Sequence, residues 1–422
     1  MNQVTVIIEH SYGLYAALPI VEKFVNEGKE VQVFTSLDLV EVAKQQLPSR
    51  SIEIKSLAPY QSGLAKRLTI LFEVIFVPID FSRTYTERKA VKWSKRSLYL
   101  SKLTKWVKLP AKRVNKVYTE WFAKLIEWGL IKGLPNNSGD YIAFTKVQHP
   151  YMLTPIANRL TLIMESWDHP MKEPYLVAPA RHLAWNSDLA EEARQFQGLS
   201  SVACLENSLK FRYVSEFKEI DPLFLVSRLT ENLAEDLIEN TKQKYLVYPM
   251  CTSSSYNGFA GEIAFLEDLS TQLKTSGIPL YVRPYPLAPA KDIERIRRVA
   301  GVTVGYSTAL KNGSDVLHEP SQIHKYLLIR NAVAVINVGT TFALDAAAIG
   351  TPVVQLRLED DRYGDFSPYS RGVHIVKHLW RLESIAFDSS LELKIDQNVL
   401  GRASKFSIDL RTWIFKGTKN LI

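Results

Sequence analysis

The chain has 422 residues, of which 46% are hydrophobic and 23% are charged, and its formal net charge is +8. These values are ordinary for a soluble globular protein, and the length predicts two domains of roughly 200 residues each. The sequence contains no apolar run of about 18 residues that would predict a transmembrane helix and no signal-peptide pattern at its start. The two cysteines, Cys204 and Cys251, have no metal-binding spacing and predict a reducing compartment.

The positive charge is concentrated in one segment. Between Arg83 and Lys116 there are twelve Lys and Arg residues and one acidic residue, Glu87, a net +11, so the rest of the chain carries −3. A general nucleic-acid binder is therefore less favoured than a protein with one basic region.

The first 57 residues alternate apolar strands with short helices. Strands are predicted at 4–9, 31–35 and 52–57, and helices at 14–26 and 37–45. This alternation is typical of an open, mostly parallel α/β sheet, in which ligands bind beyond the carboxyl ends of the strands. Directly after the first strand come His10, Ser11, Tyr12 and Gly13, which either form a turn or take part in binding.

Residues from about 60 to 133 interrupt this alternation with a helical, basic and aromatic composition. Basic side chains attract anionic lipid head groups, and Trp and Tyr favour the membrane interface. The residues predicted to contact a membrane are Lys92, Trp93, Lys95, Lys102, Lys105 and Trp106. The alternatives are a solvated helical face over a core and, without any supporting motif, a nucleic-acid surface.

The alternation then resumes. Strands are predicted at 140–146, 160–164 and 183–186, a helix at 188–197, and a charged linker at 214–243. A second α/β series follows, with strands at 245–249, 280–283, 302–306, 332–338 and 353–356 and helices at 263–275, 291–299, 321–329 and 342–349. Two similar halves with a cleft between their strand ends are therefore expected.

The stretch 331–356 predicts a buried strand, a tight turn at Gly339, a helix from Phe342 to Ile349 and a further strand. Thr340 or Thr341 supplies the N-cap hydroxyl, and Gly350 ends the helix. A helix that begins directly after a strand presents unpaired N–H groups and a positive dipole end, which suits a phosphate. The alternative is an ordinary βαβ unit without a ligand.

Four motifs in order resemble the GT-B glycosyltransferases of bacterial surface-polysaccharide (lipopolysaccharide O-antigen or capsule) biosynthesis. They are Ser166-Trp-Asp168 with Lys172, the run 183–193, Val282-Arg-Pro-Tyr-Pro286 and the run 339–354. The resemblance covers about residues 140–358 and the general form of the first 57. His169 and Glu173 replace the Asn and Gly that such proteins often carry.

This resemblance implies an α/β fold of two Rossmann-like domains that face each other across a cleft, with the helical insertion in the first. The expected segments are an acceptor-binding domain at 1–213, the linker at 214–243, a nucleotide-sugar-binding domain at 244–400, and a segment at 401–422 whose helix, about Lys405 to Ile414, packs back on the first domain.

For the donor, Arg283 at a strand end can neutralise a phosphate or form a surface ion pair. Asp345 either binds a ribose hydroxyl or faces solvent. The full set of predicted donor-binding residues is Arg283, Gly339, Thr340, Thr341, Asp345, Thr252, Ser253 and Glu319. The predicted acceptor-binding residues are Ser11, Tyr12, Gly13, Trp167 and Lys172.

Transfer of a sugar to a hydroxyl needs a base or a carboxylate nucleophile. Asp168 is the first candidate, with a salt bridge to Lys172 as the alternative role, and His10 and His149 follow. The resemblance implies no cofactor and no catalytic metal.

The leading hypothesis is a cytoplasmic glycosyltransferase, peripheral on the inner face of the membrane, that transfers sugar from a nucleotide donor to a lipid-linked or growing surface glycan. The alternatives are a sugar-nucleotide epimerase of similar two-domain fold and a non-catalytic binding protein with a degenerate GT-B fold.

Overall fold

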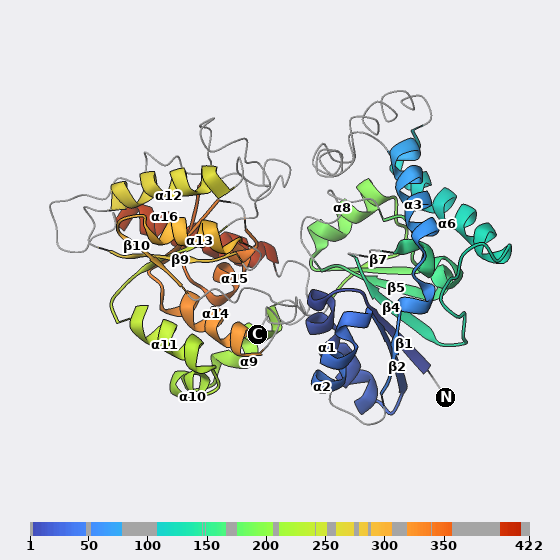
Figure 1. The fold of residues 1–422 in the computed structure, drawn as a ribbon, viewed down its shortest axis with the longest axis horizontal. Coiled ribbons are helices and arrows are strands. Elements are labelled where there is room, and N and C mark those ends of the chain that lie inside the picture. The colour runs from blue at the N-terminus through green and yellow to red at the C-terminus, as the bar shows by residue number, and fades with distance from the viewer. Residues whose placement is uncertain are drawn as a thin grey trace. The chain divides into compact units, whose positions relative to one another are not determined.

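The computed structural model describes residues 3–47, 52–77, 108–145, 147, 149–165, 175–205, 211–240, 242–250, 259–273, 278–285, 288–305, 319–338, 340–356 and 397–414. The chain forms two compact units, unit 1 and unit 2, whose main segments are Met1–Lys210 and Phe211–Phe415 (Figure 1). Each unit is built on one parallel sheet with helices packed on it, so the predicted class of two Rossmann-like α/β domains is confirmed.

Unit 1 contains a seven-stranded sheet in the order β3-β2-β1-β4-β5-β6-β7. Its strands are β1 Gln3–Ile8, β2 Glu30–Thr35, β3 Glu53–Ser56, β4 Asp140–Phe144, β5 Leu160–Ile163, β6 Arg181–Ala184 and β7 Val202–Cys204. Its helices are α1 Ser11–Asn26, α2 Val40–Gln46, α3 Gly63–Phe76, α6 Ala111–Glu127 and α8 Ser187–Gln197, with 3-10 segments η1 Leu37–Leu39, η2 Ala58–Tyr60 and η5 Pro150–Arg159. The strand order reverses between β1 and β4, which is where ligands bind in such sheets.

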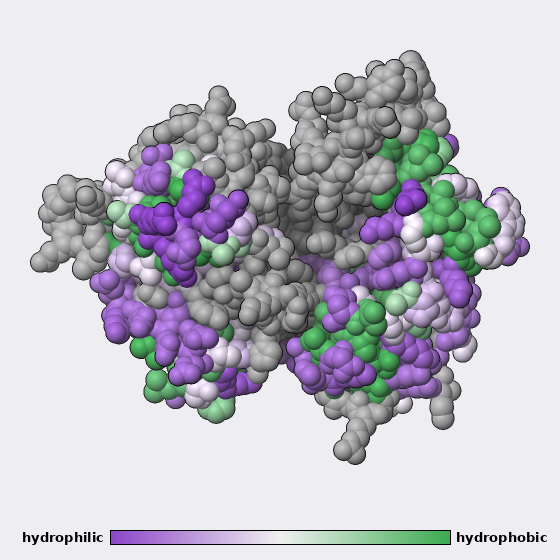
Figure 2. Space-filling model, in the orientation of Figure 1, coloured by the Kyte–Doolittle hydropathy of each residue, from purple (hydrophilic) through white to green (hydrophobic). Residues whose placement is uncertain are grey.

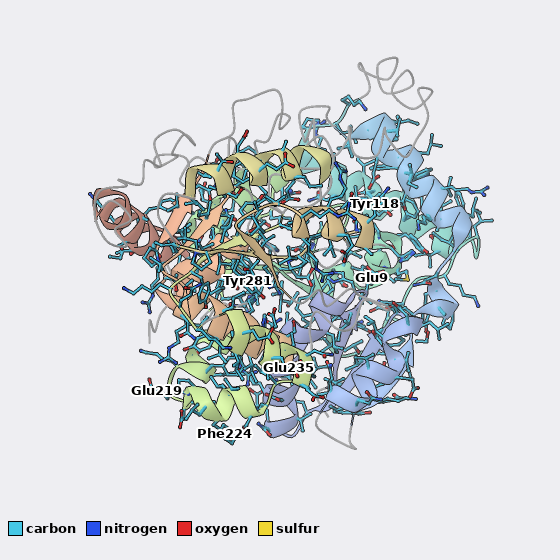
Figure 3. The ribbon with its side chains drawn as sticks, turned by 60° about the vertical axis from the view of Figure 1, so that its left-hand side comes forward. Glu9, Tyr118, Glu219, Phe224, Glu235 and Tyr281 are labelled. Atoms are coloured by element: carbon cyan, nitrogen blue, oxygen red, sulfur yellow. The ribbon has the colours of Figure 1, made fainter. Side chains whose placement is uncertain are left out.

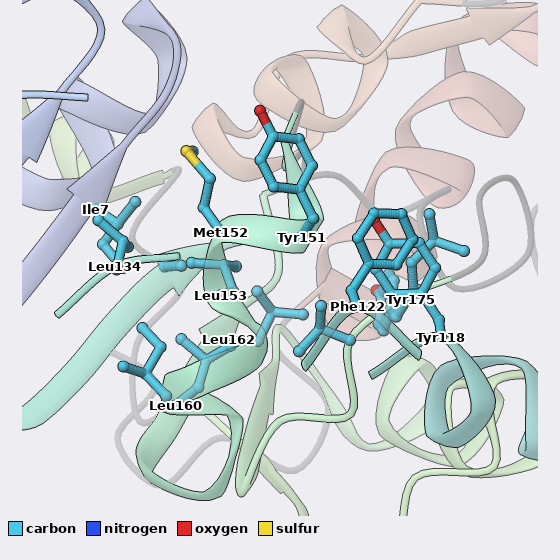
Figure 4. Packing of buried hydrophobic residues seen from close by; sticks show 14 of the residues in the cluster. Ile7, Tyr118, Phe122, Leu134, Tyr151, Met152, Leu153, Leu160, Leu162 and Tyr175 are labelled. Carbon is cyan, nitrogen blue, oxygen red and sulfur yellow. The ribbon is translucent and has the colours of Figure 1, made fainter. Parts of the chain in front are cut away.

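Both faces of this sheet are covered. Val4, Val6 and Ile8 of β1 lie in one buried cluster with side chains of α1 and α2. Ile7 points to the opposite face and lies in a second cluster with Tyr118 of α6 (Figure 4). A strand buried on both sides reads as a continuous apolar run, which explains the sequence Val-Thr-Val-Ile-Ile at the start of the chain.

Unit 2 contains a five-stranded sheet in the order β10-β9-β8-β11-β12, which reverses between β8 and β11. Its strands are β8 Leu246–Pro249, β9 Leu280–Arg283, β10 Val302–Val304, β11 Ala334–Asn337 and β12 Val353–Gln355. Its helices are α9 Arg212–Lys218, α10 Pro222–Ser227, α11 Glu231–Asn240, α12 Phe259–Leu273, α13 Ala290–Arg297, α14 Glu319–Asn331, α15 Phe342–Ile349 and α16 Gln397–Ile414.

One prediction about chain organisation is wrong. The predicted linker 214–243 folds as α9, α10 and α11 of unit 2, and these helices pack on α14 because their apolar residues, such as Phe217 and Leu225, are buried. The described contacts of α16 are with α15 and β12 of the same unit, where Ser407 Oγ donates to Thr351 O at 2.7 Å. The expected packing of this helix on the first domain stays a prediction.

Helices α3 and α6 are the described parts of the predicted insertion at 60–133. The residues predicted to contact a membrane, Lys92 to Trp106, lie outside the described residues. Among the described helices, none is long and apolar enough to span a bilayer.

Candidate functional site

A histidine–carboxylate pair lies at the carboxyl end of the unit 1 sheet. Glu9 directly follows β1 (Figure 3), and His149 follows β4 across the point where the strand order reverses. His149 Nδ1 lies 2.9 Å from Glu9 Oε1, and the His149 backbone N–H donates to the same oxygen at 3.2 Å. Both side chains are largely buried.

This contact fixes the tautomer and the orientation of the His149 imidazole. A carboxylate at Nδ1 places the ring proton on Nδ1 and leaves a lone pair on Nε2, the arrangement of an oriented general base. Among the described residues, none forms a hydrogen bond with Nε2 of His149.

A second histidine–carboxylate pair is held by the next residue of the chain. His10 Nε2 lies 3.0 Å from Glu165 Oε2, and Glu165 follows β5. His10 also caps α1, because its Nδ1 accepts a hydrogen bond from the Gly13 backbone N–H at 3.2 Å. The capping bond requires an unprotonated Nδ1, so a neutral His10 ring carries its proton on Nε2, toward Glu165.

Glu165 is buried, with 8% of its side chain exposed. Neither of its carboxylate oxygens has a hydrogen bond of standard geometry with the described residues. A Cβ atom on Gly13, the third residue of α1, would lie 3.2 Å from Glu165 Oε1. The carboxylate therefore sits against the first turn of α1, in the space that a glycine leaves open.

This placement separates the roles of the two units. The N-terminus of α1 is the position at which a Rossmann-type sheet commonly holds a phosphate. In unit 1 a carboxylate already lies there, and it would repel a phosphate. The corresponding edge of unit 2 carries a cation instead.

Arg283 is the last residue of β9, and its Cζ lies 5.4 Å from the centroid of the Phe342 ring. Phe342 is the first residue of α15. The guanidinium is thus placed beside a helix N-terminus that follows β11 at the reversal of the strand order. A fixed guanidinium and a helix N-terminus together favour an anion.

The turn between β11 and α15 is held by buried amides. Asn337 Oδ1 accepts hydrogen bonds from the Thr340 backbone N–H at 3.1 Å and from Thr340 Oγ1 at 2.7 Å. Asn337 Nδ2 donates to Gln355 Oε1 on β12 at 2.7 Å. Thr340 Oγ1, one residue before the N-cap position, also accepts from the Phe342 N–H at 3.2 Å.

These bonds change the role of Thr340. Its hydroxyl proton is directed to Asn337, so the prediction that this hydroxyl donates to a phosphate is not supported. Thr341 makes no capping bond with its side chain and is partly exposed. Thr341 therefore remains the better candidate for a hydroxyl contact with an anion.

The predicted role of Asp345 is wrong. This residue is neither solvent-facing nor available to a ribose, because it is buried and accepts a hydrogen bond from Tyr213 Oη at 2.5 Å. Lys325 Nζ lies 3.2 Å from the same oxygen. The carboxylate joins α15 to α9 and α14.

Several predicted site residues have no described side chain. Ser11 and Tyr12 lie in α1 and Glu319 begins α14, but only their backbone is described. Outside the described residues altogether are Asp168, Trp167, Lys172, Gly339, Thr252 and Ser253. Their roles stay predictions, as does the absence of a catalytic metal; in the described part of the chain, no group of three His, Cys, Asp or Glu residues could hold a metal ion.

Glu9, Glu165 and Asn337 were not predicted as site residues. All three are polar residues at the end of an apolar strand, Val4 to Ile8, Leu160 to Met164 and Val333 to Ile336 respectively. That position was the available signal, since it is where side chains of a parallel sheet reach a ligand.

No protein-family profile matches the chain, and no curated protein sequence matches it. Solved structures do match it over nearly its whole length. The UDP-GlcNAc 2-epimerase from Methanocaldococcus jannaschii has 10% sequence identity and a TM-score of 0.50, with 99% of this chain and 96% of that chain covered. The chain has the GT-B fold.

Two further structures are similar. UDP-GlcNAc 2-epimerase from Neisseria meningitidis bound to UDP-GlcNAc has 10% identity and a TM-score of 0.49, covering 99% of this chain and 95% of that chain. The calicheamicin glycosyltransferase CalG4 has 13% identity and a TM-score of 0.42, with the same two coverages. At these identities the likeness concerns the fold, and the GT-B fold serves more than one reaction.

Proposed function

We propose that this protein is an enzyme that binds a nucleotide sugar and epimerises its sugar. The anion site at Arg283 and the α15 N-terminus suits the diphosphate of such a substrate. The Methanocaldococcus jannaschii protein of the same fold is a UDP-GlcNAc 2-epimerase, which supports this substrate class.

The observation that carries the proposal is the presence of two acid–base pairs at one sheet edge. Consecutive residues, Glu9 and His10, hold His149 and Glu165. Epimerisation at a carbon breaks a C–H bond on one face of the sugar and forms a C–H bond on the other. One group accepts the first proton and a second group donates the new one, so the reaction needs two groups of this kind.

A glycosyltransferase is the second candidate, with a lipid-linked glycan as acceptor and a place on the inner face of the cytoplasmic membrane. The observation that favours it is the exposed apolar face of α3, with Leu64 and Leu71 beside basic residues. A lipid-linked acceptor would use such a surface, whereas a soluble nucleotide sugar would not. Transfer to a hydroxyl needs one base, and His149 oriented by Glu9 can serve.

The test is to incubate the full-length protein in D₂O with UDP-, GDP-, dTDP- and CMP-sugars and to record proton NMR spectra. An epimerase gives a second sugar stereoisomer and loses one sugar proton signal to exchange without any acceptor. A transferase releases nucleotide only when a lipid-linked acceptor is added.

The variant His149→Gln separates catalysis from binding. We expect it to bind the nucleotide as the wild type does and to lose at least a hundredfold in turnover. If calorimetry shows nucleotide binding but no condition gives turnover, the protein is a non-catalytic binding protein. If no nucleotide binds at all, both enzymatic candidates are rejected.

A further inference from the structure

Helix α3 of unit 1 has an inner face that is already occupied. Phe72 packs against Tyr118 of α6 in an edge-to-face contact with centroids 5.1 Å apart, and it stacks on Trp121 at 5.8 Å. Thr69 Oγ1 and Tyr118 Oη form a hydrogen bond of 2.8 Å. The core therefore needs nothing from the opposite side of this helix.

That opposite side is nevertheless apolar. Leu64 and Leu71 are 54% and 42% exposed, and they lie two turns apart on one side of the helix. Lys66 and Arg67 lie between them and are also exposed. Figure 2 shows hydrophobic colour gathered over the region of α3 and α6, with hydrophilic residues beside it.

The described residues that flank the segment 78–107 lie beside this helix. The Leu109 backbone N–H donates to Phe76 O at 2.8 Å, and Lys108 Nζ donates to Val74 O at 2.5 Å. Lys108 and Leu109, the described residues that follow the segment 78–107, therefore contact the last turn of α3. By sequence this segment contains eight Lys and Arg residues and two acidic ones.

We infer that the outer face of α3 is a docking surface for an anionic membrane. Exposed leucines are stabilised when they enter the apolar part of the membrane interface. Basic residues near the lipid surface are attracted to anionic head groups, and salt weakens this attraction. The inference does not depend on which reaction the enzyme performs.

Two other groups of exposed apolar residues do not fit this partner. On α10 of unit 2, Leu223 and Phe224 are exposed, but the acidic residues Glu219 and Asp221 lie close to them in the sequence. Phe224 and Glu219 are labelled in Figure 3. An anionic surface would repel these acids. Leu37 on η1 is 69% exposed in unit 1, and Asp38 follows it directly.

The test is sedimentation of the full-length protein with vesicles of phosphatidylcholine alone or with one third phosphatidylglycerol. The double variant Leu64→Gln/Leu71→Gln removes the apolar contacts, and Leu37→Gln is the matched control at an exposed leucine of the same unit. We expect wild type and control to bind the anionic vesicles equally. The double variant should bind at least tenfold more weakly, and the binding of all forms should fall at 0.5 M salt.

Three results would overturn the inference. They are absence of wild-type binding to the anionic vesicles, equal binding of the double variant and wild type, and equal binding to neutral and anionic vesicles. Light scattering after gel filtration adds a fourth: a wild-type dimer that the double variant converts to a monomer would assign the face to a second copy of the chain. Matching circular dichroism melting curves confirm that the variants are folded.

Discussion

Tyr213 donates its hydroxyl to Asp345 at 2.5 Å, and Lys325 Nζ lies 4.4 Å from the centroid of the Tyr213 ring. One buried carboxylate thus holds a phenol and an ammonium group from two other helices. Because α15 also provides the N-terminus of the anion site, this contact fixes the helix that the proposed phosphate would meet.

We expect Asp345→Ala to lower the free energy of unfolding by about 3 kcal/mol, because it removes a buried carboxylate that pairs with Lys325. Tyr213→Phe should cost about 1 kcal/mol, the typical value of one hydrogen bond. Urea denaturation measures both, with Asp409→Ala on the exposed side of α16 as the control. A loss below about 0.5 kcal/mol for Asp345→Ala would contradict a structural role for this network.

Arg283→Ala should raise the dissociation constant of the donor nucleotide at least tenfold, about 1.4 kcal/mol, because a charge-assisted contact to phosphate is removed. Isothermal titration calorimetry with UDP, GDP and dTDP measures this. Arg297→Ala is the matched control, since Arg297 is an exposed arginine of the same unit that pairs with Glu294. Equal affinities of wild type and Arg283→Ala for every nucleotide that binds would refute the anion site.

Gly13→Ala tests the position of Glu165 without removing it. The new Cβ would push Glu165 Oε1 by a few tenths of an ångström, and we expect turnover to fall roughly threefold to tenfold, since catalytic groups tolerate little displacement. Gly63→Ala is the control, because a Cβ in the first turn of α3 meets nothing within 4 Å. Nucleotide binding and thermal unfolding should be retained in both variants. If both alanine variants keep wild-type turnover, Glu165 has no positional role in the reaction.

Glu192 on α8 gives a prediction for pH. Burial and the nearby charge of Asp188 raise the pKa of Glu192 to about 7. Between its ordinary pKa of 4.5 and about 7 the folded chain binds a proton that the unfolded chain has released, so stability falls as pH rises through this window.

Glu192→Gln should therefore reduce the fall of the free energy of unfolding with rising pH, and it should raise this free energy at pH 8. Because Glu192 is partly exposed, the expected increase is about 1 kcal/mol. Urea denaturation at pH 5 and pH 8 measures it, with the exposed neighbour Glu191→Gln as the control. A wild-type stability that does not change between these pH values would show that Glu192 titrates normally.

Local signals in the sequence predicted the elements around the candidate site well. The helix Phe342–Ile349 has the predicted bounds: the Thr340 hydroxyl accepts from the Phe342 N–H at its start, and Gly350, with φ of 96°, ends it. The strand Leu280–Arg283 was also predicted to the residue. The strand Val202–Cys204 was missed, since three half-buried residues give no readable period.

Pairings between distant parts of the chain were not predictable from local patterns. Glu9 meets His149 across 140 positions, a contact that depends on the order of β1 and β4 in the sheet. The place of Asp345 one turn into its helix suggests a ligand or solvent, and no local pattern indicates its partner Tyr213, which lies 132 positions away in the sequence. The charged residues at 214–243 show no clear helical periodicity. The helices there, α9 to α11, are stabilised by packing on α14 rather than by their own helix propensity.

The carboxylate of Glu165 against the first turn of α1 has a consequence for stoichiometry. Of the two strand-to-helix junctions described at the reversal points, one is blocked to phosphate by the chain itself and the other is lined by a guanidinium. Although the chain contains two parallel sheets, it should therefore bind one nucleotide per molecule. Binding should saturate near one mole of nucleotide per mole of protein.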